Sequence, residues 1–140
     1  MPPVRAAFST GPTLQIARIS PAVVAFDGDV LAIGGENAEG PLRSMESWTP
    51  GESRWTARAT MKVPRTLHTA TVLADDAGVL ITGGGGAHRD ARLAERWTGM
   101  EFVLAGRMTA VRSRGTATLL ADGRVTALHT PRRCSSTVAC

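Results

Sequence analysis

The stretch that decides the fold is GVLITGG, residues 78–84, a short apolar run that stops on two glycines. A similar run, GDVLAIGG, occupies residues 28–35, and a third, GRVTAL, occupies residues 123–128. In the third copy His129 and Thr130 stand where the glycines are expected. A strand-like run that recurs with its flanking residues indicates a repeat architecture. The rest of the chain is arranged around these three copies.

The repeat has a period of 47 residues, which three independent sets of positions share. The arginines Arg18, Arg65 and Arg112 are 47 residues apart (65 − 18 and 112 − 65). The same spacing relates Phe8, Trp55 and Phe102, and it relates Leu14, Met61 and Met108. The glycine pairs lie 49 residues apart (83 − 34), because the turn before the second pair is longer. Length changes that are recovered within a unit are typical of strands joined by turns, since loops absorb them.

Each unit is predicted to hold four short strands. The first strand is expected at 21–26, 69–74 and 116–121, the second at 30–33 and 79–82, the third at 44–48 and 93–97, and the fourth from Trp55 or Phe102. Turns rich in Asp and Gly between the first two strands suit tight hairpins. The continuous apolar run of the second strand indicates burial on both faces. No window shows a sustained 3.6-residue period, so little helix is predicted.

These units resemble Kelch repeats, the blades of a β-propeller. The resemblance rests on an arginine before the first strand, Asp-Gly in the first hairpin, a glycine pair, and a glutamate beside an aromatic residue. The motif positions are Gly34, Gly35, Glu46, Trp48 and Trp55 in the first unit, and Gly83, Gly84, Glu95 and Trp97 in the second. The resemblance covers roughly residues 8–128 and implies an all-β fold. About two and a half four-stranded antiparallel blades are expected, which is an incomplete propeller.

The resemblance also divides the chain into segments. An end strand of a preceding blade is expected at 1–17, blades at 18–64 and 65–111, the start of a third blade at 112–128, and an aberrant tail at 129–140. A propeller needs roughly four to eight blades to close. Three explanations stay open: a fragment of a longer propeller, an oligomer that completes a ring by self-association, or a truncated gene product without independent function.

The shared spacing predicts how the repeated residues support the blades. Glycine pairs permit positive φ and the close approach of a neighbouring blade. The tryptophans supply large apolar area, and each indole N–H needs a partner. Glu46 and Glu95 are predicted to pair with arginines such as Arg65 or Arg112 and so to fix how the blades dock.

Composition excludes several classes of protein. The 140 residues are 43% hydrophobic and 20% charged, as in a globular domain. No apolar run is long enough to span a membrane, and no signal peptide is evident. The net charge is +4, and Lys62 is the only lysine. The arginines are spread along the chain, which indicates a solvated surface and argues against a nucleic-acid-binding patch. The compartment is not predicted.

Four local patterns could suggest a chemical site, and each has a simpler structural explanation. The glycine-rich loop at 83–88 lacks the Gly-Lys-Ser/Thr of a phosphate loop. Acidic turns at 27–29 and 75–76 offer fewer oxygens than calcium requires. The tail residues His129, Cys134 and Cys140 lack the spacing of a zinc site. A packed structural role is predicted for His68. No catalytic residue, metal or cofactor is predicted.

Residues 69–75 and 116–122 look most similar to bacterial Kelch proteins, including those grouped with galactose oxidase. That resemblance implies a copper-radical centre built on tyrosine, with a Tyr–Cys crosslink. The chain contains no tyrosine, so such chemistry is not expected within these residues. The alternative that the chain is part of a galactose oxidase-like or other propeller enzyme, with catalytic residues on other blades, stays open.

The function predicted from these features is that of a non-catalytic interaction module. Extended repeat surfaces bind partners through loops of variable length. A protein or glycan partner is expected, and neither nucleic acid nor a membrane. The candidate binding residues follow the two glycine pairs and are Glu36, Asn37, Arg43, His88, Arg89 and Asp90.

Overall fold

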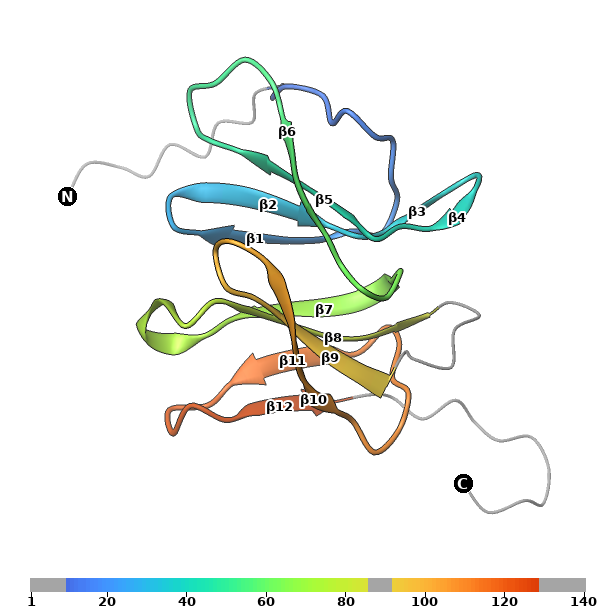
Figure 1. The fold of residues 1–140 in the computed structure, drawn as a ribbon, viewed down its shortest axis with the longest axis vertical. Coiled ribbons are helices and arrows are strands. Elements are labelled where there is room, and N and C mark those ends of the chain that lie inside the picture. The colour runs from blue at the N-terminus through green and yellow to red at the C-terminus, as the bar shows by residue number, and fades with distance from the viewer. Residues whose placement is uncertain (1–9, 86–91, 129–140) are drawn as a thin grey trace.

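The computed structural model describes residues 10–85 and 92–128, which form an all-β fold. Two four-stranded antiparallel sheets and one two-stranded sheet, here called blades 1, 2 and 3, are stacked in chain order (Figure 1). No α-helix occurs among these residues, and η1 (Ala74–Asp76) is a 3₁₀ turn. The prediction of an all-β fold of antiparallel, incomplete blades with little helix is confirmed.

The two large blades are meanders with the same internal order. Blade 1 contains β1 (Ala22–Phe26), β2 (Asp29–Ile33), β5 (Ser44–Trp48) and β6 (Thr56–Thr60), in that spatial order. Blade 2 contains β7 (Thr66–Val72), β8 (Val79–Gly85), β9 (Leu93–Trp97) and β10 (Phe102–Arg107). Blade 3 contains β11 (Thr116–Leu119) and β12 (Val125–Leu128). The third-strand predictions match the observed bounds, whereas the others differ at their ends.

A small hairpin interrupts blade 1 between β2 and β5. It consists of β3 (Glu36–Asn37) and β4 (Gly40–Pro41), which pair with each other and not with the blade. The sequence did not reveal these strands because two residues carry no periodicity. In Figure 1 the hairpin and the β6–β7 connection lie at one end of the blades, on the right. The turns β1–β2, β7–β8 and β11–β12 lie at the opposite end.

The main core lies between blades 1 and 2. Pairing of Ile33 with Met45 puts these side chains and Leu31 on one face of blade 1, because side chains alternate along a strand. The buried cluster comprises Phe26, Leu31, Ile33, Met45, Met61, Val79, Ile81, Trp97 and Phe102. Burial of each large apolar side chain contributes about 1.5–3 kcal/mol. This cluster therefore holds the two blades together.

The first hairpin turns differ between the blades. Asp27 and Gly28 join β1 to β2 with φ of 51° and 81°, as a tight hairpin with two left-handed residues requires. In blade 2 the predicted tight turn is replaced by η1, where Asp75 and Asp76 have φ of 53° and 54°. The two extra residues of this longer turn account for the glycine spacing of 49.

The ends of the chain are described only in part. Residues 10–17 contain no strand, and the strand expected near Phe8 lies outside the described residues. The predicted tail with Cys134 and Cys140 also lies outside them, as do His129 and Thr130. Within the described ranges no helix is long and apolar enough to cross a membrane.

Candidate interaction surface

The glycine pairs lie where one blade meets the next. The N–H of Gly35 donates to the carbonyl of Arg65 at 2.8 Å, and the N–H of Gly84 donates to the carbonyl of Arg112 at 2.7 Å. A Cβ at Gly34 would lie 2.7 Å from the Arg65 carbonyl oxygen, closer than non-bonded atoms approach. Only glycine, with φ of 59° here, permits this contact. Each pair therefore ties its blade to the following one.

A buried arginine–glutamate pair stabilises each large blade. Arg18 contacts Glu46 at 2.7 Å, and Arg65 contacts Glu95 at 3.2 Å. The Arg65 guanidinium also donates to the carbonyl oxygens of Gly83 and Leu93. Burial lowers the pKa of Arg65, and the charge of Glu95 opposes that shift. The predicted pairing of Glu95 with Arg65 is confirmed.

Each glutamate also binds the chain segment that leads into its blade. Glu46 accepts the N–H groups of Gln15 and Ile16 at 2.7 and 3.1 Å. Glu95 accepts those of Lys62 and Val63 at the same two distances. The glutamates therefore anchor the connections between repeats as well as the arginines. Arg112, the third arginine of the series, makes no ion pair within residues 10–85 and 92–128.

Aromatic residues of each large blade lie in pairs. Trp48 lies 6.2 Å from Trp55, and Trp97 lies 5.2 Å from Phe102, measured between ring centroids. The indole N–H of Trp48 donates to the carbonyl of Glu52. The indole N–H of Trp55 donates to that of Pro12. These contacts are consistent with a structural role for the tryptophans.

His68 is buried beside the glycine pairs. Its ring Cε1 would lie 2.8 Å from a Cβ at Gly34, and its own Cβ lies near Gly84. Neither ring nitrogen makes a well-formed hydrogen bond. Burial, and secondarily the charge of Arg65, lower the pKa of His68 to about 4, although the backbone of Ile33 acts in the opposite direction. The ring is therefore neutral and packed at neutral pH.

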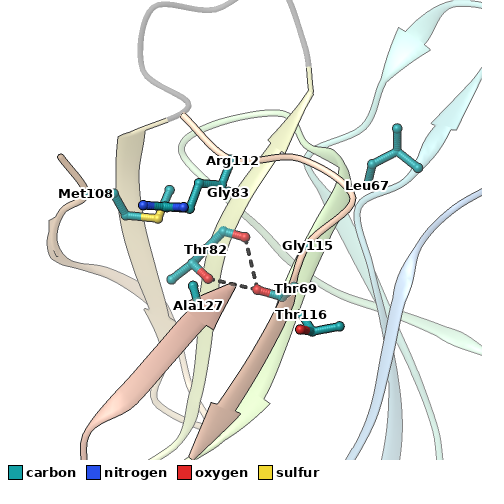
Figure 2. Close-up of a pocket in the computed structure, with 9 residues that line it drawn as sticks. All are labelled: Leu67, Thr69, Thr82, Gly83, Met108, Arg112, Gly115, Thr116 and Ala127. Atoms are coloured by element: carbon teal, nitrogen blue, oxygen red, sulfur yellow. Dashed lines mark hydrogen bonds between the residues drawn. The ribbon is translucent and has the colours of Figure 1, made fainter. Parts of the chain in front are cut away.

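A small cavity lies between blades 2 and 3. It is shown in Figure 2 and is lined by Leu67, Thr69, Thr82, Gly83, Met108, Arg112, Gly115, Thr116 and Ala127. The Thr69 hydroxyl meets the Thr82 hydroxyl at 2.8 Å within it. Its volume of about 10 Å³ is close to that of one water. The cavity is too small to be a binding site for an organic ligand.

Two larger grooves lie near the hairpin β3–β4, and the predicted binding residues are divided between them. Glu36 and Asn37 line a shallow groove of about 420 Å³ together with Ile19. Arg43 lines a second groove, of about 480 Å³, together with Lys62. The sequence offered no signal for Lys62 beyond its being the only lysine. The other predicted binding residues, His88, Arg89 and Asp90, lie outside the described residues.

No cluster of three or more His, Cys, Asp or Glu side chains that could hold a metal ion occurs within the described ranges. Two aspartates in or beside turns bind groups of the chain itself. Asp29 accepts a hydrogen bond from the Thr49 hydroxyl at 2.7 Å, and Asp122 accepts one from the N–H of Arg124 at 3.0 Å.

Comparison with known proteins supports the Kelch assignment for the first repeat. Residues 17–62 match the family model for the Kelch motif. A segment of 44 residues is 41% identical to Protein C13 of Swinepox virus (strain Kasza) and covers 31% of this chain. The matched segment spans 9% of the length of that protein. The similarity to bacterial proteins grouped with galactose oxidase is not tested by these matches and stays a prediction.

Proposed function

We propose that these Kelch-type blades form a non-catalytic module that binds a protein or glycan partner through the loops at one end. The proposal is supported mainly by the asymmetry of the two ends. At one end the connections within the blades have two to seven residues, from 27–28 to 49–55. At the other end, blade 1 carries the added hairpin β3–β4 and both of the larger grooves near it. Buried ion pairs hold the sheets that display these loops.

Site-specific crosslinking tests which end of the blades binds a partner. A photoreactive residue placed at Ala38, an exposed position at the tip of the hairpin β3–β4, is compared with one at Pro50. Pro50 is an exposed turn position at the opposite end of the same blade. For a protein partner, we expect the Ala38 replacement, and not the Pro50 replacement, to form specific adducts with proteins of the source organism. For a glycan partner, we expect the chain to bind a glycan array, and only the Ala38 replacement to weaken that binding. Equal adducts from both positions, or none together with no glycan binding, would argue against the proposal.

Self-association that completes a ring is a further part of this proposal. Val23 is 57% exposed on the outer face of β1. Its counterpart one period later is Ala70, which packs against the core between blades 1 and 2. The outer face of blade 1 therefore exposes an apolar side chain at the position where blade 2 packs against its neighbour, as expected of a face that packs against another blade. An enzyme fragment whose catalytic residues lie on other blades is the alternative, and it would require those blades for activity.

A further inference from the structure

The groove near Arg43 has two walls from different parts of blade 1. One wall is the end of the hairpin and the start of β5, residues 41–44, and the other is the β6–β7 connection, residues 62–64. Pro41, Leu42 and Pro64 supply apolar surface, whereas Val63 is 4% exposed. Its volume of about 480 Å³ lies within the range of roughly 300–1,000 Å³ that is typical of ligand pockets.

The two walls are joined by hydrogen bonds and do not need to be assembled by a ligand. The N–H of Met61 donates to the Arg43 carbonyl at 2.9 Å, and the N–H of Arg65 donates to the Leu42 carbonyl at 3.0 Å. Met61, Val63 and Arg65 are almost completely buried, whereas Lys62 is exposed. Because the backbone is held in place, binding here costs little ordering of the protein.

The charge on the groove has one sign. Arg43 and Lys62 are both exposed, and neither side chain has a hydrogen bond or ion pair within the described residues. No Asp or Glu lines the groove. Two positive side chains beside apolar surface complement a ligand that carries both carboxylates and apolar groups.

The backbone of this wall is not available to hold a phosphate. Phosphate loops bind anions with several free N–H groups, but the N–H groups of 61–65 are already used. Those of Lys62 and Val63 bind Glu95, those of Met61 and Arg65 bind blade 1 carbonyls, and Pro64 has none. Anion recognition therefore depends on the two side chains, with contact area from the apolar wall.

The equivalent position in blade 2 has one of the two positive side chains and not the other. The N–H of Met108 donates to the Arg92 carbonyl at 2.7 Å, which repeats the bond between Met61 and Arg43. Arg92 thus corresponds to Arg43, but Thr109 stands where blade 1 has Lys62 (109 − 47). The cationic pair is accordingly a property of blade 1 and not a requirement of the repeat.

We propose that this groove binds an acidic, partly apolar segment of a protein partner, with Arg43 and Lys62 contacting its carboxylates. The proposal rests on the interaction role proposed above and names its partner chemistry. The extended segment lies between the walls, and its apolar side chains contact Leu42 and the two prolines.

Binding is tested with two pools of capped hexapeptides and the full chain immobilised. One pool contains Asp, Glu, Leu and Val at every position, and the matched pool contains Asn, Gln, Leu and Val. At low salt we expect the chain to retain the acidic pool about tenfold better than the amide pool. The preference is no larger because each exposed ion pair contributes less than about 1 kcal/mol. The Arg43→Gln/Lys62→Gln variant should lose this preference, with an unchanged far-UV circular dichroism spectrum.

The control variant removes the same number of charges from blade 2. Arg92→Gln/Arg107→Gln changes two exposed arginines and should keep the preference within about twofold, because each lies outside the groove. Acetylation of Lys62, the only lysine, gives a second readout. The acidic pool should slow this reaction relative to that of the α-amino group, whereas the amide pool should not.

Three results would overturn the proposal. They are equal retention of both pools, equal loss in the two double variants, and binding of heparin as tight as that of the acidic pool with the same dependence on Arg43 and Lys62. If the Ala38 crosslinks persist in the Arg43→Gln/Lys62→Gln variant, the interaction role stands while the groove assignment fails. If the Ala38 replacement gives no crosslinks even in the chain that keeps Arg43 and Lys62, the interaction role itself fails.

Discussion

The buried ion pairs were partly predictable at the scale of single residues. The period of 47 places Arg65 and Glu95 in one unit, and opposite charges at repeated positions suggested a pair. The hydrogen bonds that each glutamate accepts from the preceding connection were not predictable, because they depend on where the backbone of 15–16 or 62–63 passes. The orphaned ring of His68 was likewise invisible, since burial of a single histidine depends on the glycines that pack against it.

Removal of the Glu95 carboxylate should be strongly destabilising. Glu95 is fully buried, and Arg65 is 1% exposed, so Glu95→Ala leaves a buried guanidinium without its partner. Such a loss costs about 3–5 kcal/mol. We expect urea unfolding of the full chain to show a decrease of this size. Asp122→Asn is the control, because its pair with Arg124 is exposed and contributes less than about 1 kcal/mol. A similar effect of both changes would contradict the role assigned to Glu95.

Acid should destabilise the chain through His68. The folded-state pKa of about 4 lies below the unfolded value of about 6.5, so the unfolded chain binds the proton more readily. This contribution to stability is fully present above about pH 6.5 and is lost as pH falls toward 4. Between pH 7.5 and 5 we expect a loss of about 2 kcal/mol in urea unfolding. His68→Gln should remove that part of the pH dependence, and an unchanged slope would refute this assignment.

At the scale of strands and turns, the 47-residue repeat located the strands of the three blades. Residues 44–48 and 93–97 were predicted with their observed bounds, because the same glutamate and tryptophan recur in both units. The hairpin β3–β4 and the turn η1 were missed. Both are held by short-range backbone geometry, which leaves no alternation of apolar and polar residues to detect. The groove was missed for the same reason, since it forms between this hairpin and the distant segment 62–64.

The close approach between blades 2 and 3 predicts different tolerance at two glycines with similar backbones. A Cβ at Gly83 would lie 2.3 Å from the Arg112 carbonyl oxygen, whereas one at Gly123 would meet nothing within 4 Å. Their φ angles are 72° and 82°, so the backbone strain of alanine is shared. Gly123→Ala should cost about 1–2 kcal/mol, and Gly83→Ala about 1–3 kcal/mol more. Equal costs in urea unfolding would mean that blade 3 is not docked at Gly83.

At the scale of the whole molecule, the stacking direction of the blades follows from one set of contacts made twice. Gly35 bonds the backbone of blade 2, and Gly84 bonds the segment that leads into blade 3. Blade 3 contributes β11 and β12 to the described residues, so it covers part of blade 2. Blade 1 and blade 3 consequently present two different end faces. A head-to-tail contact between such faces closes into a ring or extends into a filament.

Val23 provides the test of self-association, because its side chain lies on the outer face of blade 1. It is 57% exposed, and no core residue of its own blade depends on it. Val23→Lys adds a charge to that face and should abolish oligomers that the unmodified chain forms, as measured by light scattering across a concentration series. The free energy of unfolding of the variant should change by less than about 0.5 kcal/mol, as at other surface positions. A discrete ring-sized mass that survives Val23→Lys would place the contact on another surface, and a monomer in both proteins would remove the self-association proposal.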